Sequence, residues 1–176
     1  HVYSQEMEHD ACGVGLIAST EGKKSRAVVE YGIEALKAVW HRGAVDADGK
    51  TGDGAGIHVE IPKDFFIEKI QVTGHDYDNS EICVGMIFLP RNDYSAQENC
   101  KTIVESELTK NNFSIYGWRQ VPVNPKVLGE KALQTMPEII QVLFKSNDPN
   151  LLDKNLERKI YEIRKRIENK AFEASL

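Results

Sequence analysis

A cysteine stands where a polar arm gives way to an apolar stretch. Residues 9–18 read His-Asp-Ala-Cys-Gly-Val-Gly-Leu-Ile-Ala. An apolar run of this length predicts a buried strand over residues 12–19, and glycines within it indicate close approach of another backbone or a substrate. Cutting the peptide bond before Cys12 would place a free α-amino group, with a pKa near about 8, beside the thiol as its base. Cys12 is therefore either a nucleophile or an ordinary small apolar residue at a strand edge.

Segments typical of strands and of helices alternate along the rest of the chain. Ser25 can cap a helix that runs to about His41, and Gly43 sits where a helix-terminating glycine belongs. Because several connections are too short for a uniformly parallel sheet, the sequence predicts an α+β layered domain. Further strands are expected at residues 54–61, 82–89, 113–121 and 139–145, and further helices from Pro62, at 94–111 and at 151–171.

Composition excludes several classes of function. A chain of 176 residues allows one domain with a real core, and a net charge of −5 argues against a nucleic-acid partner. The sequence contains no run of 18 apolar residues, so no membrane span is predicted, and no secretory signal pattern is visible. The three cysteines form no CxxC pair, which fits neither a disulfide framework nor a zinc site. The expected setting is a reducing cytoplasm.

Two glycine-rich stretches match phosphate-binding patterns only in part. The run from Gly13 to Ala18 fits G-x-G-x-x-A, but its glycines lie inside the expected strand rather than between a strand and a helix. The run from Gly52 to Gly56 lacks the Gly-Lys-Ser/Thr ending of a phosphate loop. We interpret the second stretch as a tight turn that exposes its backbone, with Asp53 as a turn residue.

Three motifs follow one another in an order that resembles the start of the glutamate synthase large subunit. That start is a class II glutamine amidotransferase domain. The resemblance implies a four-layer αββα sandwich of the N-terminal-nucleophile type, incomplete in this chain. Residues 1–11 would be a leader, and residues 12–176 the N-terminal part of the domain. The three motifs are Asp10-Ala-Cys-Gly-Val-Gly15, His41-Arg-Gly-Ala44 and Thr51-Gly-Asp-Gly-Ala-Gly-Ile57. Later segments that also resemble the family are Val127-Leu-Gly129, Pro137 with Ile140-Gln141, and the charged run 156–166.

The resemblance also implies a chemistry: hydrolysis of the glutamine side-chain amide. Cys12 would be the nucleophile, and Arg42 and Gly43 would be further catalytic residues. A guanidinium beside Cys12 would favour the thiolate and orient polar groups. The alternative for Arg42 is a basic side chain that stabilises a helix C-terminus.

Other parts of the implied enzyme are expected outside this segment. Ammonia would pass to 2-oxoglutarate in the remainder of the large subunit, which carries FMN and an iron-sulfur cluster and works with a small subunit. No cofactor is expected in residues 1–176, and the family's glutamine-carboxylate and oxyanion-hole segments would lie beyond Leu176. The segment alone is therefore predicted to be inactive. The alternatives are a non-catalytic structural or interaction module and a different N-terminal-nucleophile amidohydrolase.

Overall fold

The computed structural model describes residues 13–52 and 54–176. They fall into two compact units, each treated by itself. The amino-terminal unit comprises the described residues up to 60 together with residues 124–135, and the sheet unit comprises residues 61–123 and 136–176.

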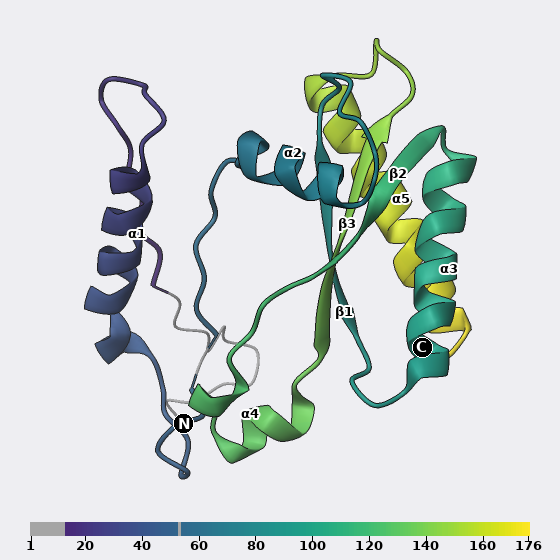
Figure 1. The fold of residues 1–176 in the computed structure, drawn as a ribbon. Coiled ribbons are helices and arrows are strands. Elements are labelled where there is room, and N and C mark those ends of the chain that lie inside the picture. Colours follow the sequence, from purple (N-terminus) through teal and green to yellow (C-terminus); the bar gives the residue numbers. More distant parts are fainter. Residues whose placement is uncertain (1–12, 53) are drawn as a thin grey trace, which may run out of the picture. The chain divides into compact units, whose positions relative to one another are not determined.

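An antiparallel sheet forms the centre of the sheet unit. Its strands are β1 (Cys83–Leu89), β2 (Phe113–Gln120) and β3 (Glu138–Ser146), in the order β1-β3-β2 (Figure 1). Each outer strand pairs with β3, and the pairing of β2 shifts register between Ile115 and Gly117. The three strands expected in this part of the sequence are therefore confirmed to within about two residues.

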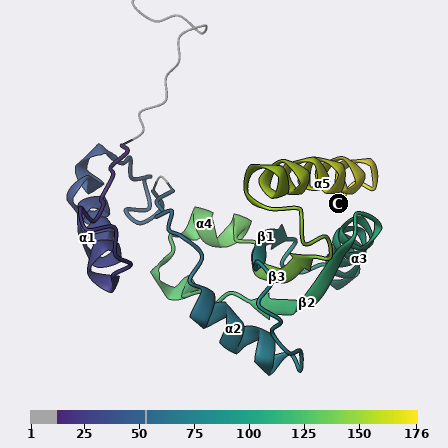
Figure 2. The same cartoon turned by 90° about the horizontal axis from the view of Figure 1, so that it is seen from above.

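Helices cover both faces of this sheet. Helices α3 (Tyr94–Lys110) and α5 (Asp153–Glu173) lie on one face and α2 (Lys63–Val72) on the other (Figure 2). Each face has its own buried cluster, since alternate side chains of a strand point to opposite faces. The α3 and α5 side buries Cys83, Val104, Leu108, Phe113, Val142, Phe144, Leu156 and Ile163, and the α2 side buries Phe66, Ile70, Ile82, Tyr116 and Leu143.

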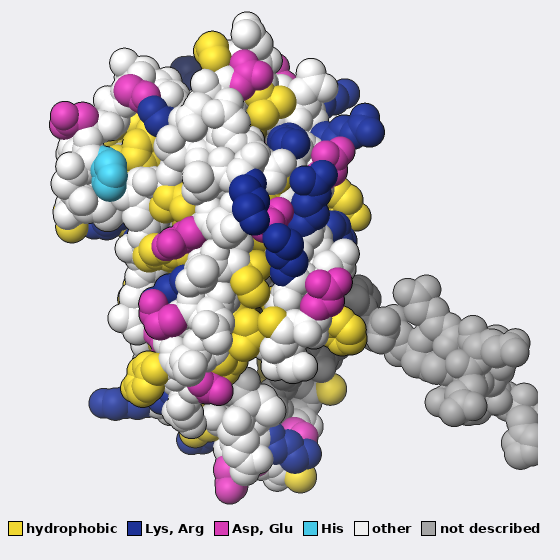
Figure 3. Space-filling model, turned by 90° about the vertical axis from the view of Figure 1, so that its right-hand side faces the viewer, with side chains coloured by type: hydrophobic (Ala, Val, Ile, Leu, Met, Phe, Trp, Pro, Cys, Tyr) yellow, Lys and Arg dark blue, Asp and Glu magenta, His cyan; other side chains and the backbone are white. Residues whose placement is uncertain are grey.

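Local chemistry explains where these helices begin and which way they face. The Asp93 carboxylate accepts the backbone N–H of Ala96 at 2.9 Å and so caps α3. On α5 the charged side chains of two ion pairs, Arg158 with Glu162 and Arg164 with Glu168, lie on the solvent side, while Leu156 and Ile163 face the core. Figure 3 shows basic and acidic side chains interspersed on the molecule's face at this side.

The sequence of elements β1-α3-β2-β3-α5, with both helices on one face, is a split β-α-β arrangement. Among the described residues no strand pairs with the outer edge of β1. Met86 and Phe88, on the α2 side of β1, are 48% and 64% exposed. An open edge beside exposed apolar side chains is a typical surface for strand pairing.

The amino-terminal unit is built from short helices. Its elements are α1 (Arg26–Ala38), the 3₁₀ turns η1 (Trp40–Arg42) and η2 (Pro125–Val127), and α4 (Glu130–Thr135). The predicted cap is confirmed, because the Ser25 hydroxyl accepts the N–H of Ala27 at 3.2 Å. Two elements, η2 and α4, were not expected from the sequence.

Two predicted strands are wrong. Neither residues 13–19 nor residues 54–61 form a strand in the part of the chain that the structure describes. Their apolar side chains are exposed, with Val14 at 95% and Leu16 at 89%. A strand forms only where a neighbouring backbone completes its hydrogen bonds, and no described segment does so here.

The fold is thus α+β, as the sequence predicts, with a small antiparallel sheet. None of the described helices is long and apolar enough to cross a bilayer.

Candidate active site

Two of the three predicted catalytic residues, Arg42 and Gly43, lie just after the end of α1. The helix stops at Ala38, three residues before the predicted end, and the chain continues as the 3₁₀ turn η1, which ends at Arg42. Gly43 closes that turn by donating its N–H to the Trp40 carbonyl at 3.0 Å. Its φ of −81° is not the left-handed conformation of a helix-terminating glycine, so that prediction is corrected.

Cys12 lies outside the described residues, and so does the side chain of Arg42. The backbone of Arg42 is described, in η1. The predicted contact between the Arg42 guanidinium and the Cys12 thiol therefore stays a prediction.

The two described cysteines are poor nucleophiles. Cys83 and Cys100 are both free thiols, on β1 and α3. Burial in the core raises the pKa of Cys83 to about 12, and partial burial also raises the pKa of Cys100. Because the thiolate is the reactive form of a cysteine, both thiols are less reactive at neutral pH than an ordinary exposed cysteine.

A tight hairpin follows Gly43. Val45 pairs with Gly52 in an antiparallel bridge, and the Asp46 N–H donates to the Thr51 carbonyl at 2.7 Å. The turn itself is closed by the N–H of Gly49, which donates to the Asp46 carbonyl at 2.9 Å and has a φ of +69°. We call this element the 45–52 hairpin. The turn predicted at Gly52–Gly56 is a different segment that shares only Gly52 with the hairpin; because Asp53 is not among the described residues, that turn stays a prediction.

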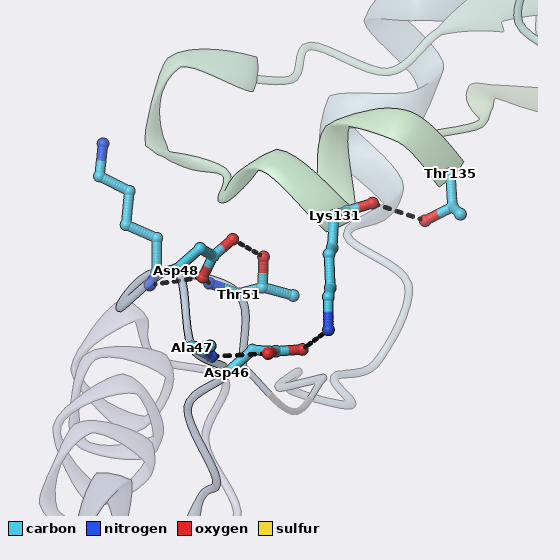
Figure 4. A network of polar contacts seen from close by, with 7 residues as sticks. Asp46, Ala47, Asp48, Thr51, Lys131 and Thr135 are labelled. Carbon is cyan, nitrogen blue, oxygen red and sulfur yellow. Dashed lines mark hydrogen bonds and ion pairs between the residues drawn. The ribbon is translucent and has the colours of Figure 1, made fainter.

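The Asp48 carboxylate holds the hairpin turn together (Figure 4). It accepts the Thr51 hydroxyl at 2.5 Å, the Thr51 N–H at 2.7 Å and the Lys50 N–H at 2.9 Å. These hydrogen bonds, first the Thr51 hydroxyl, hold the pKa of Asp48 well below its usual range, and a bond from the Glu130 N–H adds to them. Asp48 is therefore ionised at any pH near neutrality, and it bonds to both the hairpin and the first residue of α4.

A second contact joins α4 to the same hairpin. Lys131 Nζ lies 2.5 Å from Asp46 Oδ2, and Figure 4 shows the lysine reaching from the helix to the hairpin. The Thr135 hydroxyl donates to the Lys131 carbonyl at 3.4 Å, within α4. Sequence reasoning missed this contact, because Asp46 and Lys131 are 85 positions apart. The only sequence feature that pointed to this region was the resemblance of residues 127–129 to a family motif.

Comparison with known proteins identifies the family. The chain belongs to the class II glutamine amidotransferases: the family described as "Glutamine amidotransferases class-II" matches residues 12–175, so the match begins at Cys12.

Within that family, the chain resembles glutamate synthases. It is 55% identical over 168 residues to the "Glutamate synthase [NADPH] large chain" of Azospirillum brasilense. The aligned residues cover 96% of this chain and 11% of that protein. It is 40% identical over 166 residues to the "Ferredoxin-dependent glutamate synthase" of Pyropia yezoensis, covering 94% of this chain and 10% of that protein. The chain thus spans about a tenth of the length of the curated relatives it matches.

Proposed function

We propose that this chain is the glutamine-hydrolysing N-terminal portion of a glutamate synthase large chain. The observation that carries the proposal is the 55% identity to the Azospirillum large chain over 96% of these residues. The start of the family match at Cys12 supports the role of that residue as the nucleophile.

The proposed reaction needs a free amino terminus at Cys12, and hence removal of residues 1–11. The Cys12 sulfur attacks the side-chain amide carbon of glutamine, and the α-amino group of Cys12 carries the thiol proton to the leaving nitrogen. The carbon–nitrogen bond breaks, ammonia leaves, and a thioester remains on Cys12. Water then hydrolyses the thioester and releases glutamate.

Arg42 and Gly43 would complete the part of this site that residues 1–176 contribute. The turn η1 fixes the backbone of Arg42, and Gly43 starts the path into the 45–52 hairpin. A guanidinium near the thiol would stabilise the thiolate and orient the substrate's polar groups. Glutamine-carboxylate and oxyanion-hole contacts would come from beyond Leu176, so residues 1–176 alone would not turn over glutamine.

The complete domain would be the four-layer αββα sandwich that the family implies. The exposed side chains of Val14 and Leu16 support this, because they lack cover among the described residues. The free thiols of Cys83 and Cys100 favour a reducing, cytoplasmic setting.

The later steps would occur outside this segment. Ammonia would be transferred to 2-oxoglutarate by the rest of the large chain, with FMN, an iron-sulfur cluster and a small subunit. The described residues contain no group of three His, Cys, Asp or Glu side chains that could hold a metal ion.

The test is to determine the amino terminus of a glutamine-hydrolysing preparation of the full-length protein. The proposal predicts that its first residue is Cys12. A preparation that hydrolyses glutamine while still carrying residues 1–11 would contradict the mechanism. A Cys12→Ser variant with unchanged glutamine hydrolysis would contradict the assignment of the nucleophile.

A further inference from the structure

Gly129 packs against the 45–52 hairpin without room for a side chain. A Cβ built at Gly129 would overlap the Thr51 hydroxyl oxygen and the Asp48 carboxylate, and would lie 2.5 Å from the Thr51 backbone nitrogen. Real Cβ atoms do not approach other heavy atoms so closely. Any side chain at this position would thus push the hairpin away from the start of α4.

The two residues after Gly129 hold the hairpin by polar contacts. The backbone N–H of Glu130 donates to the Asp48 carboxylate, and the Lys131 ammonium pairs with Asp46. Three consecutive residues therefore hold one turn of the hairpin by close packing, a hydrogen bond and an ion pair. These contacts are individually weak at a surface, but together they fix one orientation.

The held hairpin is directly connected to the predicted catalytic residues. Its first strand residue, Val45, is two positions after Gly43, and two extended residues span only about 7 Å. Val45 pairs with Gly52, so a displacement of the turn reaches both strands of the hairpin. A shift of about 1 Å at a catalytic group can cost about a hundredfold in rate.

We propose that Gly129, the Glu130 N–H and Lys131 act as a clamp on the 45–52 hairpin, and that this clamp positions Arg42 and Gly43 for glutamine hydrolysis. These are positioning residues, since none of them is placed against the substrate. The inference rests on the proposed function, in which Arg42 and Gly43 serve the Cys12 chemistry. It assigns a role to the Val127-Leu-Gly129 motif that the proposed chemistry leaves unused.

The test uses the full-length protein and two activities, glutamate synthesis from glutamine and from added ammonia. Lys131→Met and Gly129→Ala should each lower kcat with glutamine by about tenfold or more. Both should leave the ammonia-dependent rate within about twofold of wild type. Lys126→Met, a lysine in the same segment, serves as the matched control and should change neither rate.

Further variants separate positioning from folding. Lys131→Arg should restore most of the glutamine-dependent rate, because it keeps a cation opposite Asp46. Asp46→Asn combined with Lys131→Met should cost no more than Lys131→Met alone, as expected for one shared contact. Hydrogen exchange at the Asp46 and Gly49 amides should accelerate in Gly129→Ala, while α1 amides stay unchanged.

The outcomes distinguish failure of the clamp from failure of the proposed function. If Cys12→Ser abolishes the glutamine-dependent rate but Lys131→Met and Gly129→Ala leave it at the wild-type value, the clamp is overturned. Equal loss of both activities in Lys131→Met would also overturn it. If Cys12→Ser retains the glutamine-dependent rate, the proposed function itself is wrong.

Discussion

The methyl carbon Cγ2 of Thr73 lies against the backbone of Gly117, so that a Cβ at Gly117 would be only 2.8 Å from it. The Thr73 hydroxyl oxygen lies 2.6 Å from the Ile70 carbonyl and 2.8 Å from the Tyr116 carbonyl, so its one hydrogen can be donated to either the end of α2 or β2. Gly117 has a φ of +149° and sits at the register shift of β2. The register shift of β2 and the position of Thr73, the residue after α2, therefore depend on each other.

We predict that Gly117→Ala destabilises the sheet unit by about 3 kcal/mol, because it adds both backbone strain and overlap with Thr73. Gly74→Ala is the matched control: its φ is +83°, but a Cβ there meets nothing within 4 Å. That control should cost only about 1 kcal/mol, the backbone part alone. Urea unfolding of both variants measures the difference. Equal losses would contradict the packing argument.

Asp78 should make the stability of the sheet unit depend on pH in the acid range. Its carboxylate pairs with Lys145 and accepts hydrogen bonds from Ser80 and the Tyr116 hydroxyl, and these contacts, Lys145 first, hold its pKa well below the usual range. A carboxyl whose pKa is lower in the folded state contributes stability that is fully present above its unfolded pKa of about 3.9. That stability is lost as the pH falls through the folded pKa.

The measurement is the urea midpoint between pH 7 and pH 2 for the wild type and for Asp78→Asn. Asp78→Asn should lower the midpoint at pH 7, and the difference from wild type should shrink as the pH falls below about 4. Asp76→Asn provides a control acid two positions away. A difference that stays constant down to pH 2 would contradict the role of the ionised Asp78.

The 176-residue chain should self-associate through the surface around β1. The outer edge of β1 has no partner strand among the described residues, and Met86 and Phe88 are exposed beside it. Light scattering should give an average mass that rises above 19.8 kDa with concentration. The double variant Met86→Lys and Phe88→Lys should reduce association, whereas Tyr161→Lys, on the exposed side of α5, should not. A wild-type chain that stays monomeric at high concentration would contradict this prediction.

Much of the sheet unit could be predicted from the sequence, because its pattern is local. The strand at Cys83–Leu89 is a continuous apolar run, and the helix at Tyr94–Lys110 carries a stripe of apolar residues at helical spacing. Both elements find their partners within the same unit. Local pattern and tertiary packing therefore agree there.

The errors arose where local pattern and packing disagree. Residues 13–19 and 54–61 have the composition of strands, but a strand also needs a paired neighbour, and none is present among the described residues. Helix α4 was missed because six residues are too few to show a helical period. The contact of Lys131 with Asp46 could not be foreseen, because it joins distant segments through a turn whose geometry depends on Asp48.

Replacing Arg42 should affect glutamine chemistry selectively. In the full-length protein, Arg42→Ala should slow glutamine hydrolysis by about tenfold or more, because in the proposed site the thiolate and the substrate would lose an orienting cation. Direct use of ammonia should remain nearly unchanged. Arg42→Lys should recover only part of the rate, since an ammonium cannot replace a planar guanidinium. Equal loss of both activities would indicate a folding defect and would contradict the catalytic role.

The most direct test of the account is covalent labelling of the full-length protein with diazo-oxo-norleucine, a glutamine-like electrophile, followed by peptide mass mapping. The account predicts one modified residue, Cys12 at the amino terminus, protection by glutamine, and no modification of Cys83 or Cys100, whose thiols have raised pKa values. Labelling at Cys83 or Cys100 with Cys12 untouched, or labelling that glutamine does not prevent, would contradict it.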